Sequence, residues 1–196
     1  MFETIRLENG ILYHLDAHQR RMEKSYRRFF GRTVPFDLKK IIDTGKLPEK
    51  GVHRIRFVYG ENAYYIEVSA YHYKDIKTLR IVEADDLDYS LKFTDRSAIN
   101  ELLKHKNGAD DILIVKNGLI TDTSIANIAF FDGEDWLTPA SPLLEGTERE
   151  ILLEQGIIKP GQIHVNDLQG FSNFKIFNAM MDFDRQPEIS IRHILF

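Results

Sequence analysis

The chain has 196 residues, 43% of them hydrophobic, which is enough for a substantial core, and its formal net charge of −4 offers no overall positive field to nucleic acid. It has no cysteine, which excludes disulfides and thiolate metal sites. No apolar run approaches the roughly 20 residues that a membrane-spanning helix needs, and the N-terminus lacks the pattern of a signal peptide. We therefore expect a cytoplasmic protein of mixed α and β structure that contacts neither membrane nor nucleic acid.

The first half of the chain predicts alternating hairpins and helices. Two short strand-like runs flank Asn9 and Gly10, a dipeptide typical of tight hairpin turns. Asp16 is expected to cap a helix that ends at Gly31, because apolar residues recur between them at helical spacing. Residues 53–73 predict a second hairpin, since β-branched and aromatic residues fill both of its arms.

The second half predicts a mixed series of strands, hairpins and helices. Thr94 is expected to cap one helix, and Gly146 to open another. The predicted elements of this half lie at residues 95–108, 110–122, 127–139, 147–156, 162–168 and 174–182, and a strand at residues 78–84 ends the first half. The chain is therefore expected to form two small subdomains, residues 1–85 and 86–196.

Lys92 stands between Leu91 and Phe93, directly before a predicted helix start. Apolar surroundings and the positive end of a helix dipole both disfavour the ammonium form. The neutral amine is the form that condenses with a carbonyl group to give a Schiff base. The alternative is a lysine whose stem lies along an apolar surface while its charged head stays in water. Lys92 is thus a candidate catalytic residue, although local features alone leave both interpretations open.

Two further stretches carry candidate binding residues. Gly146 and Thr147 open a predicted helix, where backbone N–H groups without partners in the helix attract phosphate. An ordinary capped helix is the alternative there. Asp122 lies at the end of a predicted strand, where a carboxylate could hold the proton of a pyridinium ring. An aspartate that caps the local backbone of a turn is the alternative.

The first predicted helix is rich in basic residues. Arg21 lies beside the stripe that carries His18, Met22 and Ser25, so its guanidinium could reach inward to an anion. The other arginines of this helix are expected to form a solvated face, since no RNA-binding or DNA-binding motif accompanies them. The seven histidines are scattered without a His-x-x-x-His pair, so no metal site is expected.

Five segments, in this order, resemble the motifs of one enzyme family. They are "FETIRLENGILYHLDAHQRRM", "YSLKFTDR", "ITDTSIANIAFF", "LTPASPLLEGTERE" and "KIFNAMMDFDRQPEIS". They are distributed over nearly the whole chain, from residue 2 to residue 190, and the chain therefore resembles the class IV aminotransferases. This family comprises the pyridoxal-phosphate enzymes of fold type IV, among them branched-chain aminotransferase, D-amino acid aminotransferase and 4-amino-4-deoxychorismate lyase.

The resemblance implies an α+β protein of the PLP-dependent fold type IV, similar to D-amino acid aminotransferase, with pyridoxal 5′-phosphate as its cofactor. Lys92 matches the lysine that forms the Schiff base and moves the proton at the substrate carbon. Arg21 matches the phosphate-binding arginine, and Gly146 with Thr147 matches the backbone phosphate cradle. Asp122 stands where the family has a glutamate paired with the pyridine nitrogen.

The chain departs from the family pattern in two places. The side chain of Asp122 is one methylene shorter than glutamate, so its contact with the ring must be longer, water-mediated or made by a shifted ring. The chain also begins at the "FET" motif, whereas its relatives usually carry earlier residues that help to shape the substrate pocket. Substrate recognition is therefore the property that transfers least from the family.

Within the family, the patterns "L-x-A-H-x-x-R-M" and "K-F-T-D-R" favour 4-amino-4-deoxychorismate lyase. That enzyme eliminates pyruvate from its small-molecule substrate, aminodeoxychorismate, and leaves 4-aminobenzoate, a folate precursor. The alternatives are a branched-chain or D-amino acid aminotransferase that acts on an amino acid and 2-oxo acid, and a degenerate dimeric family member without catalysis. The resemblance also implies a homodimer in which the neighbouring subunit completes each active site.

Overall fold

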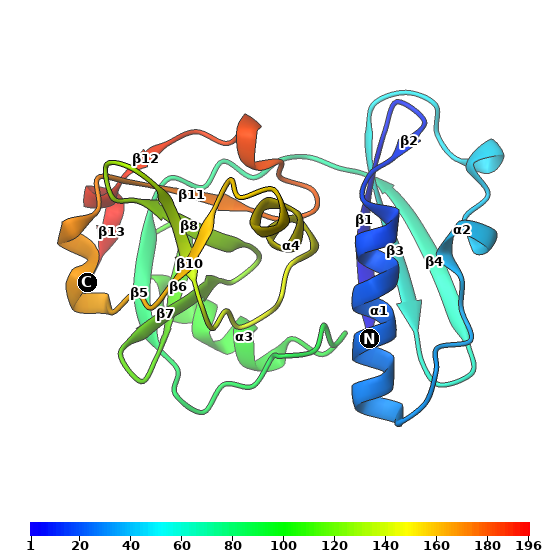
Figure 1. Ribbon diagram of the computed structural model, residues 1–196, viewed down its shortest axis with the longest axis horizontal. Coiled ribbons are helices and arrows are strands. Elements are labelled where there is room, and N and C mark those ends of the chain that lie inside the picture. Colours follow the sequence, from blue (N-terminus) through cyan, green and yellow to red (C-terminus); the bar gives the residue numbers. More distant parts are fainter. The chain divides into compact units, whose positions relative to one another are not determined.

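The computed structural model describes residues 1–196, apart from the side chain of Thr44, and has the mixed helix and sheet architecture predicted for the chain (Figure 1). The chain folds into two compact units. Their bounds are Met1–Tyr73 with Leu91–Thr94 for the N-terminal unit, and Lys74–Ser90 with Asp95–Phe196 for the C-terminal unit. The subdomain boundary at residue 85 stays a prediction.

The N-terminal unit is built on an antiparallel sheet of β1 (Phe2–Glu8), β2 (Ile11–Leu12), β3 (Val52–Tyr59) and β4 (Tyr64–Ala70). The strand order is β2-β1-β3-β4. The predicted hairpin between β1 and β2 is confirmed. Asn9 and Gly10 have positive φ angles of 51° and 81°, as a tight turn of this kind requires. The predicted hairpin of β3 and β4 is also confirmed, and its strands pair from Tyr59 with Tyr64 outward.

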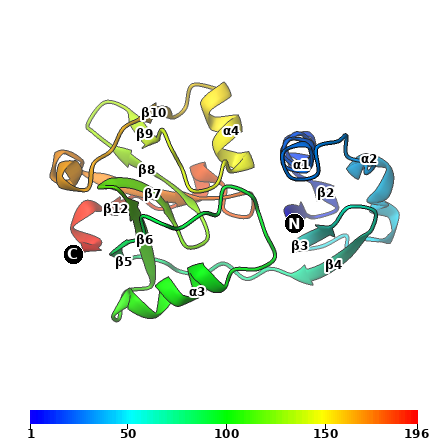
Figure 2. The ribbon, with the colours of Figure 1, turned by 90° about the horizontal axis from the view of Figure 1, so that it is seen from below.

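Helix α1 (Leu15–Phe30) covers one face of this sheet (Figure 2). Its buried side chains recur at helical spacing, and they are Ala17, His18, Met22, Ser25 and Tyr26. The predicted start of the helix is wrong in detail, because His14, with φ 55°, is the N-cap and Asp16 lies in the first turn. Gly31, with φ 72°, ends the helix as predicted. The short helices α2 (Leu38–Ile41) and η1 (Thr44–Lys46) follow.

The C-terminal unit contains two sheets. One comprises β5 (Leu79–Glu83), β6 (Asp111–Lys116), β7 (Leu119–Thr123) and β13 (Ile194–Leu195), in the order β13-β5-β6-β7. The other comprises β8 (Asn127–Phe131), β9 (Trp136–Pro139), β10 (Lys159–Gly161), β11 (Asn173–Phe177) and β12 (Ile189–Ser190), in the order β10-β9-β8-β11-β12. Buried side chains of both sheets, such as Leu113, Ile128 and Phe174, form one hydrophobic core. This core fixes the ends of β7 and β8, where predicted site residues lie.

The helices of this unit are α3 (Ser97–Leu103) and α4 (Thr147–Glu154), with the 3-10 turns η2 (Lys104–Lys106), η3 (Val165–Gly170), η4 (Phe183–Arg185) and η5 (Ile191–His193). The prediction that Thr94 caps the first of them is wrong, because Arg96 is the N-cap of α3. The Asp95 carboxylate accepts from the backbone N–H of Ser97 at 2.9 Å, so it binds the first turn instead. Lys92 is therefore separated from the helix start. Among the described residues, no helix is both long enough and apolar enough to cross a membrane.

Candidate functional site

Glu3 on β1 is the centre of a buried polar cluster in the N-terminal unit. Its side chain is 0% exposed, and α1 presents His18 and Arg21 to it from positions one turn apart. His18 donates from Nδ1 to Glu3 Oε2 at 2.7 Å. Arg21 donates from Nε to Oε1 at 3.1 Å and from Nη2 to Oε2. Arg21 thus reaches inward to an anion, and that anion is a carboxylate of its own chain.

The charges of this cluster are set by its contacts. Burial raises the pKa of Glu3, but the charge of Arg21 and the hydrogen bond from His18 outweigh burial and hold this pKa at about 2. Burial lowers the pKa of His18, despite its hydrogen bond to Glu3. His18 is therefore neutral at neutral pH, with its proton on Nδ1, because an ionised carboxylate can only accept. Its other nitrogen, Nε2, is enclosed and has no hydrogen-bond partner among the described residues.

Lys92 lies in the short segment that packs with the N-terminal unit. Its carbonyl oxygen accepts from the backbone N–H of Phe2 at 3.0 Å, so the segment is bound to the start of β1. The Lys92 Nζ lies 5.0 Å from the centre of the Phe2 ring, and the side chain is half-buried. After burial, the charges of Arg21 and Lys92 further lower the pKa of His18, which places the lysine in the electrostatic surroundings of the Glu3 cluster.

Asp122, near the end of β7, is the centre of a second polar cluster, in the C-terminal unit. Asn127, the first residue of β8, donates from Nδ2 to Asp122 Oδ1 at 2.7 Å and to the carbonyl of Leu144 at 3.0 Å. The backbone N–H of Leu144 donates to Asp122 Oδ2 at 2.8 Å. These bonds hold the segment that leads into α4 against the ends of β7 and β8.

The Asp122 carboxylate has no directly bonded cation among these partners. Burial raises its pKa to about 6, although the hydrogen bonds from Leu144 and Asn127 and the charge of Arg149 act in the opposite direction. Asp122 is therefore mostly ionised at neutral pH, and it takes up a proton only about one unit below that.

Gly146 is the N-cap of α4, as predicted, and the first helical hydrogen bond runs from the N–H of Glu150 to its carbonyl at 3.0 Å. The backbone N–H groups of the first helical turn have no carbonyl within the helix to bind. A side chain at Gly146 would not fit, because its Cβ would lie 1.9 Å from Asn127 Oδ1. Thr147 is buried, and its Oγ1 has no hydrogen-bond partner among the described residues. At this helix start the backbone of Gly146 therefore lies close to the Asn127 side chain, and the hydroxyl of Thr147 is left without a hydrogen bond among the described residues.

The predicted site residues thus lie in two sets. Arg21 and Lys92 belong to the N-terminal unit, and the set of Asp122, Gly146 and Thr147 belongs to the C-terminal unit. Sequence reasoning did not assign Glu3, His18 or Asn127 to the site, although the structure connects each of them to a predicted residue. The signal was present, because these three residues stand in the first and third of the five motif segments.

Two observations support a fit to pyridoxal phosphate. The orphaned hydroxyl of Thr147 lies at a helix start, where an anion is stabilised by the helix dipole. The N-terminal unit has a guanidinium and an amine, and the C-terminal unit has a buried carboxylate that can accept a hydrogen bond. Each Asp122 oxygen has a second lone pair, so its bonds to Asn127 and Leu144 leave acceptor capacity for a ring N–H.

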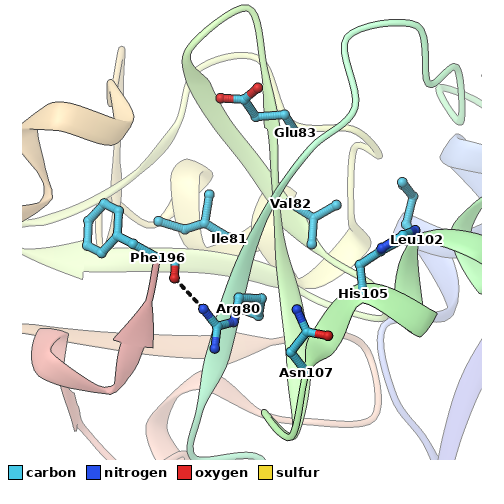
Figure 3. Close-up of a pocket in the computed structure, with 8 residues that line it drawn as sticks. All are labelled: Arg80, Ile81, Val82, Glu83, Leu102, His105, Asn107 and Phe196. Atoms are coloured by element: carbon cyan, nitrogen blue, oxygen red, sulfur yellow. Dashed lines mark hydrogen bonds between the residues drawn. The ribbon is translucent and has the colours of Figure 1, made fainter.

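A separate surface cavity of about 470 Å³ lies in the C-terminal unit (Figure 3). It is lined by residues of β5, of α3 with the turn that follows, and by Phe196. Arg80 is one of the lining residues and donates to the carbonyl of Phe196. None of the predicted site residues lines this cavity, so it is distinct from both polar clusters.

Comparisons with known proteins show the family of the chain. The sequence model of the family described as "Amino-transferase class IV" matches residues 1–183. An uncharacterized protein of Haemophilus influenzae strain Rd is 39% identical over 182 residues, which cover 92% of this chain and 97% of that protein.

Two solved structures extend the comparison. A candidate 4-amino-4-deoxychorismate lyase of Haemophilus somnus 129PT is 40% identical, with a TM-score of 0.88 over 93% of this chain and 96% of that one. A hypothetical aminotransferase of Mycobacterium tuberculosis in its PLP-bound form is 19% identical, with a TM-score of 0.74 over 96% of this chain and 79% of that one. At that identity, the second likeness shows the fold alone.

Proposed function

Because the chain belongs to the class IV aminotransferase family, we propose that it is a pyridoxal-phosphate enzyme that acts as a 4-amino-4-deoxychorismate lyase. The observation that carries the cofactor proposal is the setting of Lys92. This lysine is bound to β1 through its backbone, its Nζ lies near an aromatic ring, and its charge acts on the same cluster that holds Arg21. An amine held in this way is pre-positioned for covalent attachment to an aldehyde.

Each predicted residue has a defined task in this proposal. Lys92 attaches the cofactor covalently and then moves the proton at the substrate carbon. Arg21 binds the phosphate with its guanidinium, and Gly146 with Thr147 binds it through backbone N–H groups and the buried hydroxyl. Asp122 accepts a hydrogen bond from the protonated ring nitrogen, since its carboxylate is mostly ionised at neutral pH. When bound, pyridoxal phosphate supplies the electron sink for charge that develops at the substrate carbon.

The lyase reaction would eliminate pyruvate from aminodeoxychorismate and leave 4-aminobenzoate. The support for this substrate is the likeness to the Haemophilus somnus protein, which covers almost the whole of both chains. The alternative within the same family is transamination between an amino acid and a 2-oxo acid. The shorter side chain of Asp122 motivates a third possibility, a family member that binds the cofactor weakly and does not catalyse a reaction.

A direct product assay separates these functions. Purified protein with added pyridoxal phosphate is incubated with aminodeoxychorismate, and separately with branched-chain L-amino acids or D-alanine plus 2-oxoglutarate. We expect 4-aminobenzoate and pyruvate in equal amounts from the first mixture and no glutamate from the second. A Lys92→Ala variant serves as the control and should give neither product. Glutamate formation without 4-aminobenzoate would make the protein an aminotransferase, and no product in either mixture would support the non-catalytic member.

We further propose that the protein works as a homodimer, as its family membership implies, and that it works in the cytoplasm, a reducing compartment that suits a chain without cysteine. Light scattering at micromolar concentration should give twice the 22.8 kDa mass of one chain. A mass of one chain under these conditions would contradict the dimer.

A further inference from the structure

Glu3 is a fully buried titratable group that the proposed chemistry does not use directly. Both of its carboxylate oxygens are engaged, Oε1 by Arg21 and Oε2 by Arg21 and His18. A two-point contact of this kind fixes the plane of a guanidinium as well as its position. The orientation of Arg21 is therefore set by a residue 18 positions away in the sequence.

Glu3 also determines the state of His18. The Nδ1–H of the ring donates to the carboxylate at 2.7 Å, so Nε2 is left as a buried acceptor. The charged groups that act on this ring are those of Glu3, Arg21 and Lys92. Among these contacts, only the hydrogen bond to Glu3 selects one tautomer of His18 over the other.

Strand β1 connects this cluster to the lysine segment. Phe2 donates its backbone N–H to the carbonyl of Lys92, and the next residue, Glu3, binds Arg21 and His18. Two adjacent residues of one strand therefore hold the two predicted cofactor-binding residues of the N-terminal unit. A strand of a sheet is a rigid support for such contacts, and here β1 pairs with β3, Phe2 with Val58 and Glu3 with Phe57.

We propose that Glu3 is a positioning residue for phosphate binding, and this inference rests on the proposed function. Glu3 does not touch the cofactor but holds the Arg21 guanidinium in the orientation in which it meets the phosphate, and it keeps His18 in the Nδ1–H form. Binding of the phosphate then requires no rearrangement of Arg21, which reduces the cost of ordering on binding.

The test compares two ligands that differ only in the phosphate. Pyridoxal phosphate and pyridoxal are titrated into the wild type, Glu3→Gln, and the control Glu8→Gln, which lies on the same strand outside the cluster. We expect the wild type to prefer pyridoxal phosphate strongly, and Glu3→Gln to lose about tenfold of that preference, as is typical when an outer partner of a binding group is removed. Glu8→Gln should keep the full preference.

The titration distinguishes a failure of this inference from a failure of the proposed function. An unchanged preference in Glu3→Gln, or an equal loss of affinity for both ligands, would show that Glu3 acts only in structure and would overturn the inference. If the wild type bound neither ligand, the proposed function itself would fail and the inference with it.

A second measurement determines the tautomer of His18 in the wild-type protein and uses a variant only to assign the signals. Long-range ¹⁵N–¹H spectra of the wild type, with the His18 signals identified by their loss in His18→Asn, should show the proton on Nδ1. A proton on Nε2 would contradict the inference, because Glu3 would then not select the tautomer.

Discussion

Glu3 in the N-terminal unit and Asp122 in the C-terminal unit are both buried carboxylates, with 0% and 4% of their surface exposed. They differ in what binds them. Glu3 is bonded by a guanidinium and an imidazole, whereas Asp122 is bonded by a side-chain amide and a backbone N–H. Burial raises the pKa of both groups, yet the pKa of Glu3 is about 2 and that of Asp122 is about 6.

The charge of Arg21 is the largest effect that lowers the pKa of Glu3, whereas hydrogen bonds from uncharged donors are the largest effects that lower the pKa of Asp122. Arg21 compensates the charge of Glu3, so this group stays ionised and acts as a permanent anchor. The uncharged donors around Asp122 offset only part of the effect of burial, so this carboxylate takes up its proton near pH 6. The first arrangement suits the orientation of a binding residue, and the second suits a contact with a ring nitrogen that carries a proton.

The largest effect is expected from breaking the charge balance of the N-terminal cluster. Glu3→Gln leaves the buried Arg21 without its counter-charge, so the free energy of unfolding should fall by about 3–5 kcal/mol. Urea denaturation measures this change. The control Glu101→Gln removes an exposed pair with Lys104 and should cost less than about 0.5 kcal/mol. A loss below about 1 kcal/mol for Glu3→Gln would mean that the pair contributes no more than a surface ion pair.

The pH dependence of stability sharpens the comparison. The pKa of Asp122 is raised in the folded state from 3.8 to about 6, so the folded protein binds this proton more tightly than the unfolded chain does. The resulting contribution to the free energy of unfolding is fully present below pH 4 and is lost as the pH rises from about 4 to about 6. The full loss corresponds to about 3 kcal/mol. Glu3 acts in the opposite sense, because its lowered pKa contributes stability that is present above pH 4.5 and is lost as the pH falls toward 2.

Asp122→Asn should therefore remove the decline in stability between pH 4 and pH 6, apart from a constant offset for its altered hydrogen bonds. Denaturation curves of the wild type and the variant, collected across this range, test the expectation. If the two proteins showed the same slope with pH, the raised pKa of Asp122 would be wrong.

A smaller effect is expected at the helix start of the C-terminal cluster. In Gly146→Ala the new Cβ would lie 1.9 Å from Asn127 Oδ1, so the segment must shift, at a cost of about 1–3 kcal/mol. Thermal unfolding measures the cost, and affinity for inorganic phosphate should fall as well. Gly170→Ala is the matched control, since no atom lies within 4 Å of its Cβ position. Equal stability of the two variants would show that the close approach at Gly146 is not needed.

The hairpins were predictable from the sequence because their turns depend on local backbone geometry. Asn9 with Gly10, and Asn117 with Gly118, all have positive φ, which few other residues adopt readily. Helix starts were less predictable, since several side-chain oxygens lie near each one and only the fold selects between them. Asp95 therefore binds the first turn of α3 where Thr94 was expected to cap it.

The sequence points to site residues only where their own chemistry suggests a role, and the roles of Lys92 and Asp122 stay predictions. The partners of these residues were not predictable in the same way. Glu3 meets His18 and Arg21 only because α1 packs on β1, and Asn127 meets Asp122 only through the adjacent ends of β7 and β8. Such contacts depend on tertiary packing, which the local spacing of residues does not specify.

The covalent attachment of pyridoxal phosphate at Lys92 is the central claim, and reduction with borohydride tests it most directly. The protein is mixed with the cofactor, reduced, digested and examined by mass spectrometry. We expect one phosphopyridoxyl group per chain, on the peptide that contains Lys92, and none in Lys92→Ala. Modification spread over exposed lysines, or equal labelling of the Lys92→Ala chain, would contradict it.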